Sequence, residues 1–166
     1  YQLKRASSDG DRVWAKPVPI KVSISRIAEA LSKVYISRGI VVEIDIPAEA
    51  GFLGAEADFL EIAGNLIENA FKYSDTTVNI TATAGDEQLE LIVADDGPGI
   101  PAKQWEIVKQ RGVRLDSRPI GQGIGLSVAA ELVASYGGQL SLLDEKSRLA
   151  GANIRLVLPG KKLTGN

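Results

Sequence analysis

Histidine, cysteine and methionine are all absent from the 166 residues of the chain. Without histidine, the chain has no imidazole to act as a general base, a phosphoryl acceptor or a metal ligand. Without cysteine, it has no disulfide and no thiolate nucleophile, which fits a reducing compartment. Because the sequence begins at Tyr1 and contains no methionine, we expect it to be a fragment of a longer protein.

Strong charge and long apolar runs are lacking as well. The net charge is only −2 and there is no basic block, so nothing in the composition points to nucleic acid binding. Apolar runs such as residues 91–93 are far too short for a membrane span or a signal peptide. A composition of 45% apolar and 24% charged residues is typical of a globular protein in water, and the length indicates one domain with a sizeable core.

Hydrophobic periodicity predicts helices and strands in mixed order. Helices are expected at 25–38, 57–73 and 123–136, with a short one near 102–109, and strands at 17–22, 40–47, 77–84, 89–94, 139–143 and 152–158. Residues 85–87 are expected to join two of these strands in a hairpin. This mixture predicts an α/β sandwich with a mixed sheet.

The segment from Gly97 to Gly121 is unusually long for a connection within a compact domain. It contains three arginines, Arg111, Arg114 and Arg118. Connections of this length are usually lids, binding loops or disordered segments. We interpret this one as a mobile, cationic lid.

Three glycines alternate in GQGIGL, residues 121–126, directly before a predicted helix. Glycine lets the backbone approach a ligand closely, and a helix N-terminus offers free amides to an anion. The stretch lacks the preceding strand of the dinucleotide-binding fingerprint and the Gly-Lys-Ser/Thr of the P-loop. On its own, it fits a phosphate loop and a turn that needs positive φ equally well.

Two asparagines, Asn65 and Asn69, lie one turn apart on the polar face of the predicted helix 57–73. Asparagine is a mediocre helix former, whereas glutamate or lysine would solvate the face with better helix propensity. Two stacked amide oxygens, with Lys72 a further turn along, are suited to a hydrated Mg²⁺ and a polyphosphate. The alternative is an ordinary amphipathic helix with a solvated face.

The stretch ADDGPGIP, residues 94–101, ends an apolar strand in two aspartates and two glycines. One interpretation makes Asp95 the acceptor for the exocyclic amine of adenine, with Gly97 and Gly99 allowing the ligand to approach closely. Aspartate would then select adenine over guanine, which carries a carbonyl at that position. The alternative is a tight turn rich in Asp, Gly and Pro.

Taken together, NLIENAFKY, DDGPGI and GQGIGL resemble, in order and spacing, the ATP-binding catalytic domain of sensor histidine kinases. That domain belongs to the GHKL group, which includes the gyrase, Hsp90 and MutL ATPases. The resemblance covers residues 17–159, and DDGPGIP, QRGVRLDSRPIGQGIGL and SKVYISRGI look closest to its PhoQ-type branch of magnesium-responsive sensors. It implies a Bergerat-type ATP-binding fold, an α/β (α+β) two-layer sandwich with about three helices on one face of a mixed, mostly antiparallel sheet of about five strands.

The resemblance also implies a set of site residues. The expected nucleotide-binding residues are Asn65, Asn69, Lys72, Tyr73, Asp95, Gly97, Gly99, Ile100, Arg114, Gly121, Gln122, Gly123, Ile124, Gly125 and Leu126. Among them, Asn65, Asn69 and Gln122 are expected to bind Mg²⁺ through amide oxygens. Lys72 and Arg114 would contact phosphates, and Tyr73 would pack against the base or ribose. Asp95 would bind the adenine amine, and the glycine loop would bring amides to the phosphates.

The sequence departs from the general kinase pattern in one segment and from the ATPase members at one position. Ile107 and Val108 stand where a phenylalanine-rich box is expected before the lid, which puts the anchoring of the lid in doubt. Asn65 stands where the ATPase members place the glutamate that activates water. We therefore expect slow hydrolysis and transfer of the γ-phosphoryl group to another acceptor, a reaction that mainly needs positioning and charge neutralisation.

With no histidine in the chain, the phosphoacceptor is expected upstream, on a dimerising helical hairpin. Residues 1–16 are interpreted as the end of that hairpin and a linker, residues 17–160 as the ATP-binding catalytic domain, and residues 161–166 as a tail. The expected partners are the hairpin and, indirectly, a response regulator. We expect the domain itself to contact neither nucleic acid nor membrane and to be monomeric in isolation.

This interpretation makes the chain a protein-histidine kinase domain that uses ATP and Mg²⁺. It would lie in the cytoplasm, attached to a parent protein in the bacterial inner membrane. Two alternatives remain open at this point. One is a serine-directed kinase of the same fold, and the other is a nucleotide-sensing interaction module that binds ATP without transferring phosphate.

Overall fold

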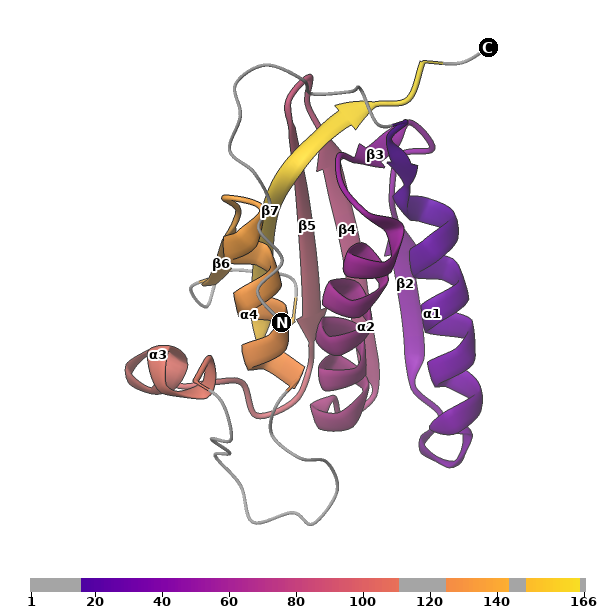
Figure 1. Ribbon diagram of the computed structural model, residues 1–166. Coiled ribbons are helices and arrows are strands. Elements are labelled where there is room, and N and C mark those ends of the chain that lie inside the picture. The colour runs from indigo at the N-terminus through magenta and orange to yellow at the C-terminus, as the bar shows by residue number, and fades with distance from the viewer. Residues whose placement is uncertain (1–15, 111–124, 144–148, 165–166) are drawn as a thin grey trace.

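The computed structural model describes residues 16–110, 125–143 and 149–164 (Figure 1). Its strands are β1 (Val18–Pro19), β2 (Val41–Asp45), β3 (Ala50–Phe52), β4 (Thr77–Ala84), β5 (Gln88–Asp95), β6 (Gln139–Leu142) and β7 (Asn153–Lys162). Its helices are α1 (Ile20–Val34), α2 (Glu56–Tyr73), α3 (Trp105–Val108) and α4 (Gly125–Ser135), with 3-10 turns η1 (Ile36–Arg38) and η2 (Ala102–Gln104).

The described strands form one mixed sheet in the order β1-β3-β7-β5-β4-β2, and β6 pairs with β7. Every pair is antiparallel except β2 with β4. Helices α1, α2 and α4 lie together on one face of the sheet (Figure 1). The predicted two-layer sandwich is confirmed, with four helices and seven strands among the described residues where the resemblance implies about three and about five.

The central strand β5 shows how the sheet divides its two faces. Leu89, Leu91 and Val93 are buried in the core, whereas Glu90 and Ile92 on the opposite face are partly exposed. Successive side chains of a strand point to opposite faces. Asp95, two residues beyond Val93, therefore lies on the helix-covered face at the end of the strand.

Helix α2 begins within one residue of the prediction and buries the predicted apolar arc. Its buried residues are Phe59, Ile62, Ala63, Leu66, Ile67, Ala70 and Phe71. The opposite side carries Asn65 and Asn69, both only partly exposed. Neither α2 nor any other helix in the described ranges combines the length and apolar character needed to cross a membrane.

The predicted boundaries are wrong at the start of the domain. The sequence predicts a strand at 17–22 and a helix at 25–38, but the strand is only Val18–Pro19 and the helix runs from Ile20 to Val34. The β-branched residues at 20–24 favour a strand locally. However, Ile20, Ile24 and Ala28 are buried along one side of a helix, and this packing overrides local propensity.

Two short elements complete this part of the fold. Residues 36–38 form the 3-10 turn η1, which Gly39 ends at a φ of 61°. Strand β3, which the sequence analysis does not predict, contains three residues, too few to show a periodic pattern. Its Phe52 is fully buried, with its ring 5.4 Å from that of Phe59 and 5.1 Å from that of Tyr136.

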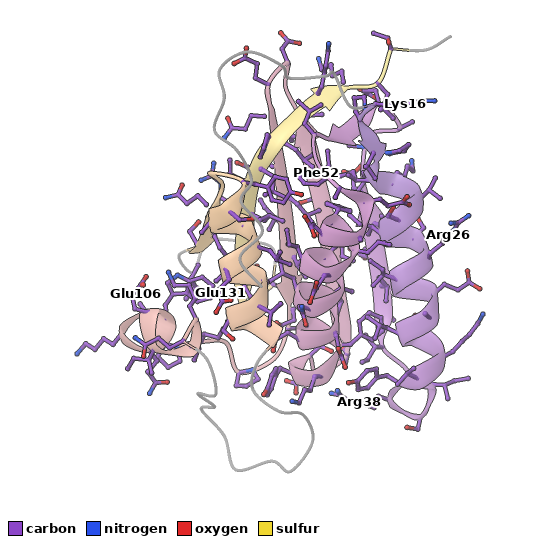
Figure 2. The ribbon with its side chains drawn as sticks, in the orientation of Figure 1. Lys16, Arg26, Arg38, Phe52, Glu106 and Glu131 are labelled. Carbon is purple, nitrogen blue, oxygen red and sulfur yellow. The ribbon has the colours of Figure 1, made fainter. Side chains whose placement is uncertain are left out.

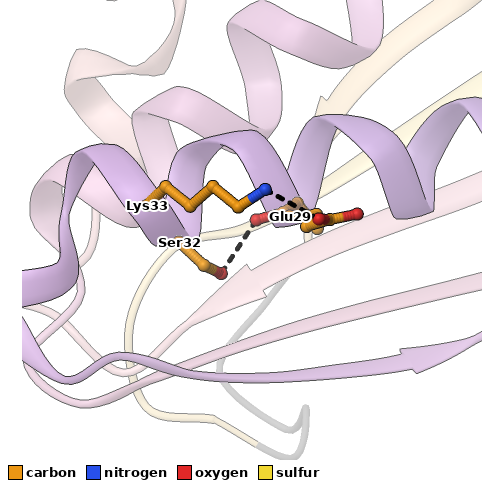
Figure 3. Close-up of polar contacts among 4 residues, drawn as sticks. Glu29, Ser32 and Lys33 are labelled. Atoms are coloured by element: carbon orange, nitrogen blue, oxygen red, sulfur yellow. Dashed lines mark hydrogen bonds and ion pairs between the residues drawn. The ribbon is translucent and has the colours of Figure 1, made fainter.

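The outer side of α1 carries ordinary surface contacts. Lys33 Nζ lies 2.8 Å from Glu29 Oε1, one turn away, and Ser32 Oγ donates a hydrogen bond to the Ala28 carbonyl at 2.8 Å. Figure 3 draws these contacts as dashed lines. The Lys33 and Glu29 side chains are 73% and 69% exposed. An exposed pair of this kind contributes little to stability.

Candidate functional site

The three sequence motifs meet at one edge of the sandwich. Helix α2 and strand β5 end at the lower edge in Figure 1, where α4 and β7 begin. A Cβ built on Gly125 at the start of α4 would lie 2.8 Å from Asn65 Oδ1 of α2, and one built on Gly97 would collide with the carbonyl of Tyr73. The asparagine helix, the aspartate turn and the end of the glycine stretch are therefore in contact.

Asp95 lies at this edge with only 3% of its surface exposed. Its Oδ1 accepts hydrogen bonds from the backbone amides of Gly97 (2.9 Å) and Ala152 (3.2 Å). Its Oδ2 has no hydrogen-bond partner among the described residues. Burial raises the pKa of this carboxyl to about 6, although the two amide hydrogen bonds oppose the rise. Asp95 therefore offers one oriented oxygen to a ligand.

Asp96 has the opposite environment. Its carboxylate accepts hydrogen bonds from the backbone amides of Asp75, Thr76 and Thr77 at 2.9–3.1 Å and from the Thr76 hydroxyl at 2.5 Å. Partial burial alone would raise its pKa, but these hydrogen bonds hold the pKa at about 2. Asp96 therefore fixes the turn between α2 and β4, while Asp95 remains directed to the site.

Two glycines bring backbone close to Asp95. Any side chain on Gly97 would collide with the end of α2, and any side chain on Gly151 would collide with Asp95 itself. The Gly151 amide donates to the Asp95 carbonyl at 2.9 Å. Gly151 and Ala152 were missed by the sequence analysis. The available signal was a glycine directly before the last strand.

The two asparagines of α2 differ in their contacts. Asn65 Nδ2 donates to the Glu61 carbonyl at 2.8 Å, one turn back in the same helix, and its Oδ1 faces Gly125. The Asn69 side chain makes no polar contact within the described part of the chain. Its amide is therefore available to a ligand, whereas that of Asn65 is partly committed to the protein.

The end of α2 adds a cation and an aromatic ring. Lys72 Nζ lies over the ring of Tyr73, 5.2 Å from its centroid. Both side chains are partly exposed. Ile100 and Leu126, from the aspartate turn and the start of α4, pack against the core beside this region. Gly99 adopts a φ of 75°, which only glycine adopts readily.

Five of the predicted site residues lie outside the described residues. They are Arg114, Gly121, Gln122, Gly123 and Ile124. The lid arginines Arg111 and Arg118 also lie outside. Of the glycine stretch, Gly125 and Leu126 are described, and both belong to the first turn of α4. The contacts of the described residues join Asn65 with Gly125, Lys72 with Tyr73, and Gly97 with both Tyr73 and Asp95, and Gly99 reaches Asp95 through Gly151. The other described site residues, Asn69, Ile100 and Leu126, lie within one helical turn or one residue of these along the chain.

The segment that leads toward the lid is anchored without a phenylalanine. Trp105 and Val108 of α3 are buried in the hydrophobic core, while Ile107 is 45% exposed. Lys109 Nζ lies 5.3 Å from the centroid of the Trp105 ring. Trp105 was missed by the sequence analysis, and its signal was the three-residue spacing to Val108. The anchoring of the predicted lid itself concerns residues 111–124, which lie outside the described residues.

The site provides separate amide and carboxylate oxygens rather than a cluster of several carboxylates. Across residues 16–110, 125–143 and 149–164, no three acidic side chains gather in a way that would hold a metal ion. An amide oxygen such as that of Asn69 suits a metal that arrives with phosphate and water ligands, as Mg²⁺ does. The donor set therefore fits a nucleotide with its cation.

Comparison with known proteins gives a family and a close curated relative. Residues 54–162 match the family described as histidine kinase-, DNA gyrase B-, and HSP90-like ATPase. The virulence sensor histidine kinase PhoQ of Salmonella typhimurium is 40% identical over 159 residues, which cover 95% of this chain and 32% of that protein. The chain therefore spans about a third of the length of this relative.

Solved structures agree with this assignment. The mycobacterial sensor histidine kinase MprB matches with a TM-score of 0.76 and 28% identity, over 88% of this chain and 97% of that chain. The ATP binding domain of PrrB from Mycobacterium tuberculosis matches with a TM-score of 0.71 and 28% identity over the same shares. The predicted resemblance, including its PhoQ-type branch, is confirmed. The chain therefore belongs to the histidine kinase-, DNA gyrase B- and HSP90-like ATPases, as an ATP-binding catalytic domain of the sensor histidine kinase type.

Proposed function

We propose that this domain binds Mg-ATP at the edge where α2, β5 and α4 meet and transfers the γ-phosphoryl group to a histidine on a separate segment. The observation that carries the proposal is Asp95, with Oδ1 held by two backbone amides and Oδ2 without a partner among the described residues. An ionised Oδ2 accepts the adenine amine and repels the carbonyl of guanine. The oriented carboxylate thus supports selection of adenine.

The contacts favour Asn69 over Asn65 as the principal Mg²⁺ ligand in this proposal. The Asn69 amide has no partner in the described part of the chain, whereas Asn65 bonds to Glu61 and faces Gly125. The oxygens of Asn65 and Gln122 would add to the Asn69 oxygen, because Mg²⁺ prefers oxygen ligands and keeps several waters. A bound Mg²⁺ would neutralise charge on the phosphates during transfer.

The remaining roles follow from the ends of the helices. Lys72, in the last turn of α2, would neutralise phosphate charge, and Tyr73 would pack against the base or ribose. The backbone amide of Gly125, at the start of α4, lies where a helix N-terminus attracts an anion. Arg114 and the amides of Gly121 and Gly123 would complete the phosphate contacts.

The residues present favour transfer over hydrolysis. Asn65 stands where the ATPase members place their water-activating glutamate, and an amide is no base. Asp95 would be bound to adenine, away from the γ-phosphate. Because histidine is absent from the chain, the acceptor belongs to another segment of the parent. We propose that this segment is an upstream dimerising hairpin, that a response regulator receives the phosphate, and that the parent lies in the bacterial inner membrane.

The test combines the domain with ATP, Mg²⁺ and a separately prepared upstream helical hairpin of the parent. The expected product is acid-labile phosphohistidine on the hairpin, formed only when all components are present. A hairpin in which the histidine is replaced by glutamine is the matched control and should remain unlabelled.

Two outcomes would contradict the proposal. Acid-stable phosphate on a serine of the partner would indicate a serine-directed kinase of the same fold. Tight ATP binding without any transfer, at protein concentrations that form the complex, would indicate a nucleotide-sensing module.

A further inference from the structure

Arg38 connects a distant part of the chain to the end of the asparagine helix. It is the last residue of η1, and its guanidinium reaches the C-terminus of α2 (Figure 2). Nη1 donates to the carbonyls of Phe71 (2.6 Å) and Lys72 (2.9 Å), and Nη2 donates to the carbonyl of Ser74. One side chain thus binds three carbonyls that are 33 to 36 residues away in sequence.

The carbonyls of Phe71 and Lys72 belong to the last turn of α2, where a helix leaves its carbonyl groups without intrahelical donors. Besides Arg38, the Ser74 hydroxyl donates to the Phe71 carbonyl at 3.3 Å. The two carbonyls also carry the partial negative charge of the helix C-terminus, which a cation offsets. The planar guanidinium presents several donors in a fixed geometry that a lysine ammonium cannot reproduce. Arg38 therefore neutralises the end of α2 and fixes its backbone at the same time.

The segment that carries Arg38 is itself held against α2 and the turn that follows it. The ring of Tyr35 lies 5.9 Å from that of Phe71, and the Val41 amide donates to the Thr76 carbonyl at 2.8 Å. Arg38 and Gly39 close η1 with hydrogen bonds to the carbonyls of Tyr35 and Ile36. The guanidinium is thus presented from a braced turn rather than from a free loop.

The residues that Arg38 holds overlap the nucleotide site. Its carbonyl partners include Lys72 itself and flank Tyr73. On the other side, the Tyr73 carbonyl is packed so closely against Gly97 that no side chain fits there. The end of α2 is therefore clamped between Arg38 and the turn that contains Asp95.

We propose that Arg38 is a positioning residue of the nucleotide site, which directs Lys72 and Tyr73 toward ATP by fixing the carbonyl end of α2. This inference rests on the proposed ATP site. Arg38 does not contact the nucleotide in this proposal, and its effect passes through the last turn of α2. Loss of the guanidinium frees that turn and leaves its negative end next to a polyphosphate.

The test is a double-mutant cycle read by calorimetric Mg-ATP binding to the full chain. Arg38→Ala is expected to weaken binding about tenfold, a change of about 1.4 kcal/mol. In a Lys72→Ala background, the same substitution is expected to weaken binding clearly less than tenfold, because one of the two groups that Arg38 positions is gone and only the contribution of Tyr73 remains. Arg26→Ala is the matched control, since Arg26 is exposed on α1 without a polar partner among the described residues. It should leave affinity unchanged.

Equal losses in the two backgrounds would overturn the inference, because they would indicate a general structural effect. An Arg38→Ala affinity equal to that of Arg26→Ala would overturn it as well. If circular dichroism shows that Arg38→Ala does not fold, Arg38→Lys replaces it in the same cycle. The loss of Mg-ATP affinity caused by Arg38→Lys is then compared between the wild-type and Lys72→Ala backgrounds. Failure of the proposed site has a different signature, because wild type would then not bind Mg-ATP or Lys72→Ala would bind it normally.

Discussion

At the scale of single residues, Asp95 and Asp96 show how neighbours in sequence acquire opposite chemistry. The Asp95 side chain is buried beneath the helices, and burial raises its pKa to about 6. Asp96 accepts hydrogen bonds from the 75–77 turn, which hold its pKa at about 2 despite partial burial. The first residue therefore keeps a carboxylate oxygen without a partner among the described residues, and the second stabilises the turn between α2 and β4.

Replacing Asp95 by asparagine tests the adenine contact. A neutral side-chain amide at this position cannot reproduce an anionic acceptor, so we expect Asp95→Asn to weaken ATP binding by about 1–3 kcal/mol. Calorimetry with ATP and Mg²⁺ measures this loss, and the affinity for GTP provides the control, because it should fall less. Unchanged ATP affinity would remove Asp95 from the adenine site.

The raised pKa of Asp95 also predicts a pH dependence of binding. The carboxylate must be ionised to accept the adenine amine, and its pKa in the free protein is about 6. ATP affinity should therefore be full above about pH 7 and should decline as the pH falls through 6, approaching about tenfold per pH unit. ATP itself is protonated in this pH range. Measuring the ATP affinity of Asp95→Asn over the same range corrects for that contribution, because the variant lacks the carboxyl. Parallel curves for the two proteins would contradict the assignment.

Asp96 predicts an effect on stability that is lost in a lower pH range than the binding effect of Asp95. Its folded pKa is depressed to about 2, so its contribution is present above the ordinary carboxyl pKa of about 4 and is lost as the pH falls toward 2. Asp96→Ala should lower the free energy of unfolding by about 1–3 kcal/mol at pH 7, because several amides lose a charged acceptor. Urea denaturation at pH 7 and pH 3 checks this, and the difference from wild type should shrink at pH 3.

At the scale of elements, two helical glycines provide a matched pair. A Cβ on Gly64 of α2 would meet no atom of the described residues within 4 Å, whereas one on Gly125 of α4 would lie 2.8 Å from Asn65 Oδ1. Gly64→Ala should therefore stabilise the domain by about 0.5–1 kcal/mol through helix propensity alone and leave ATP binding intact. Gly125→Ala should displace the Asn65 amide and weaken Mg-ATP binding about tenfold or more. Thermal unfolding and calorimetry on both variants measure the contrast, and equal ATP affinities would contradict it.

Elements with strong periodicity could be predicted from the sequence. Helix α2 and the β4–β5 hairpin were placed within about one residue, because each has a continuous pattern of buried positions. The start of α1 could not be placed, since its β-branched residues favour a strand until packing on the sheet and α2 is taken into account. Strand β3 has three residues and no pattern of its own.

At the scale of the whole molecule, the unpredicted features depend on contacts between distant segments. Asp95 and the asparagines could be recognised because their motifs have local patterns. Arg38, Gly151 and Trp105 could not be assigned their contacts, because each depends on a partner far along the chain or on burial that only the fold creates. Local sequence thus identifies the groups that would touch ATP, and the tertiary structure identifies the groups that hold them.

The division between residues that would bind ATP and residues that hold the fold predicts how ATP stabilises two variants of the domain. A ligand at 100 times its Kd raises the free energy of unfolding by about 2.7 kcal/mol, which for a domain of this size corresponds to a rise in Tm of about 5–10 °C. Asp96→Ala should begin from a lower Tm and keep most of this rise, because its role is in the turn. Asp95→Asn should lose between about a third and nine tenths of the rise at the same ATP concentration, because its affinity is expected to be about 1–3 kcal/mol weaker. Thermal unfolding with and without Mg-ATP measures both quantities, and a rise reduced equally in the two variants would show that the adjacent aspartates do not divide ligand binding from stability.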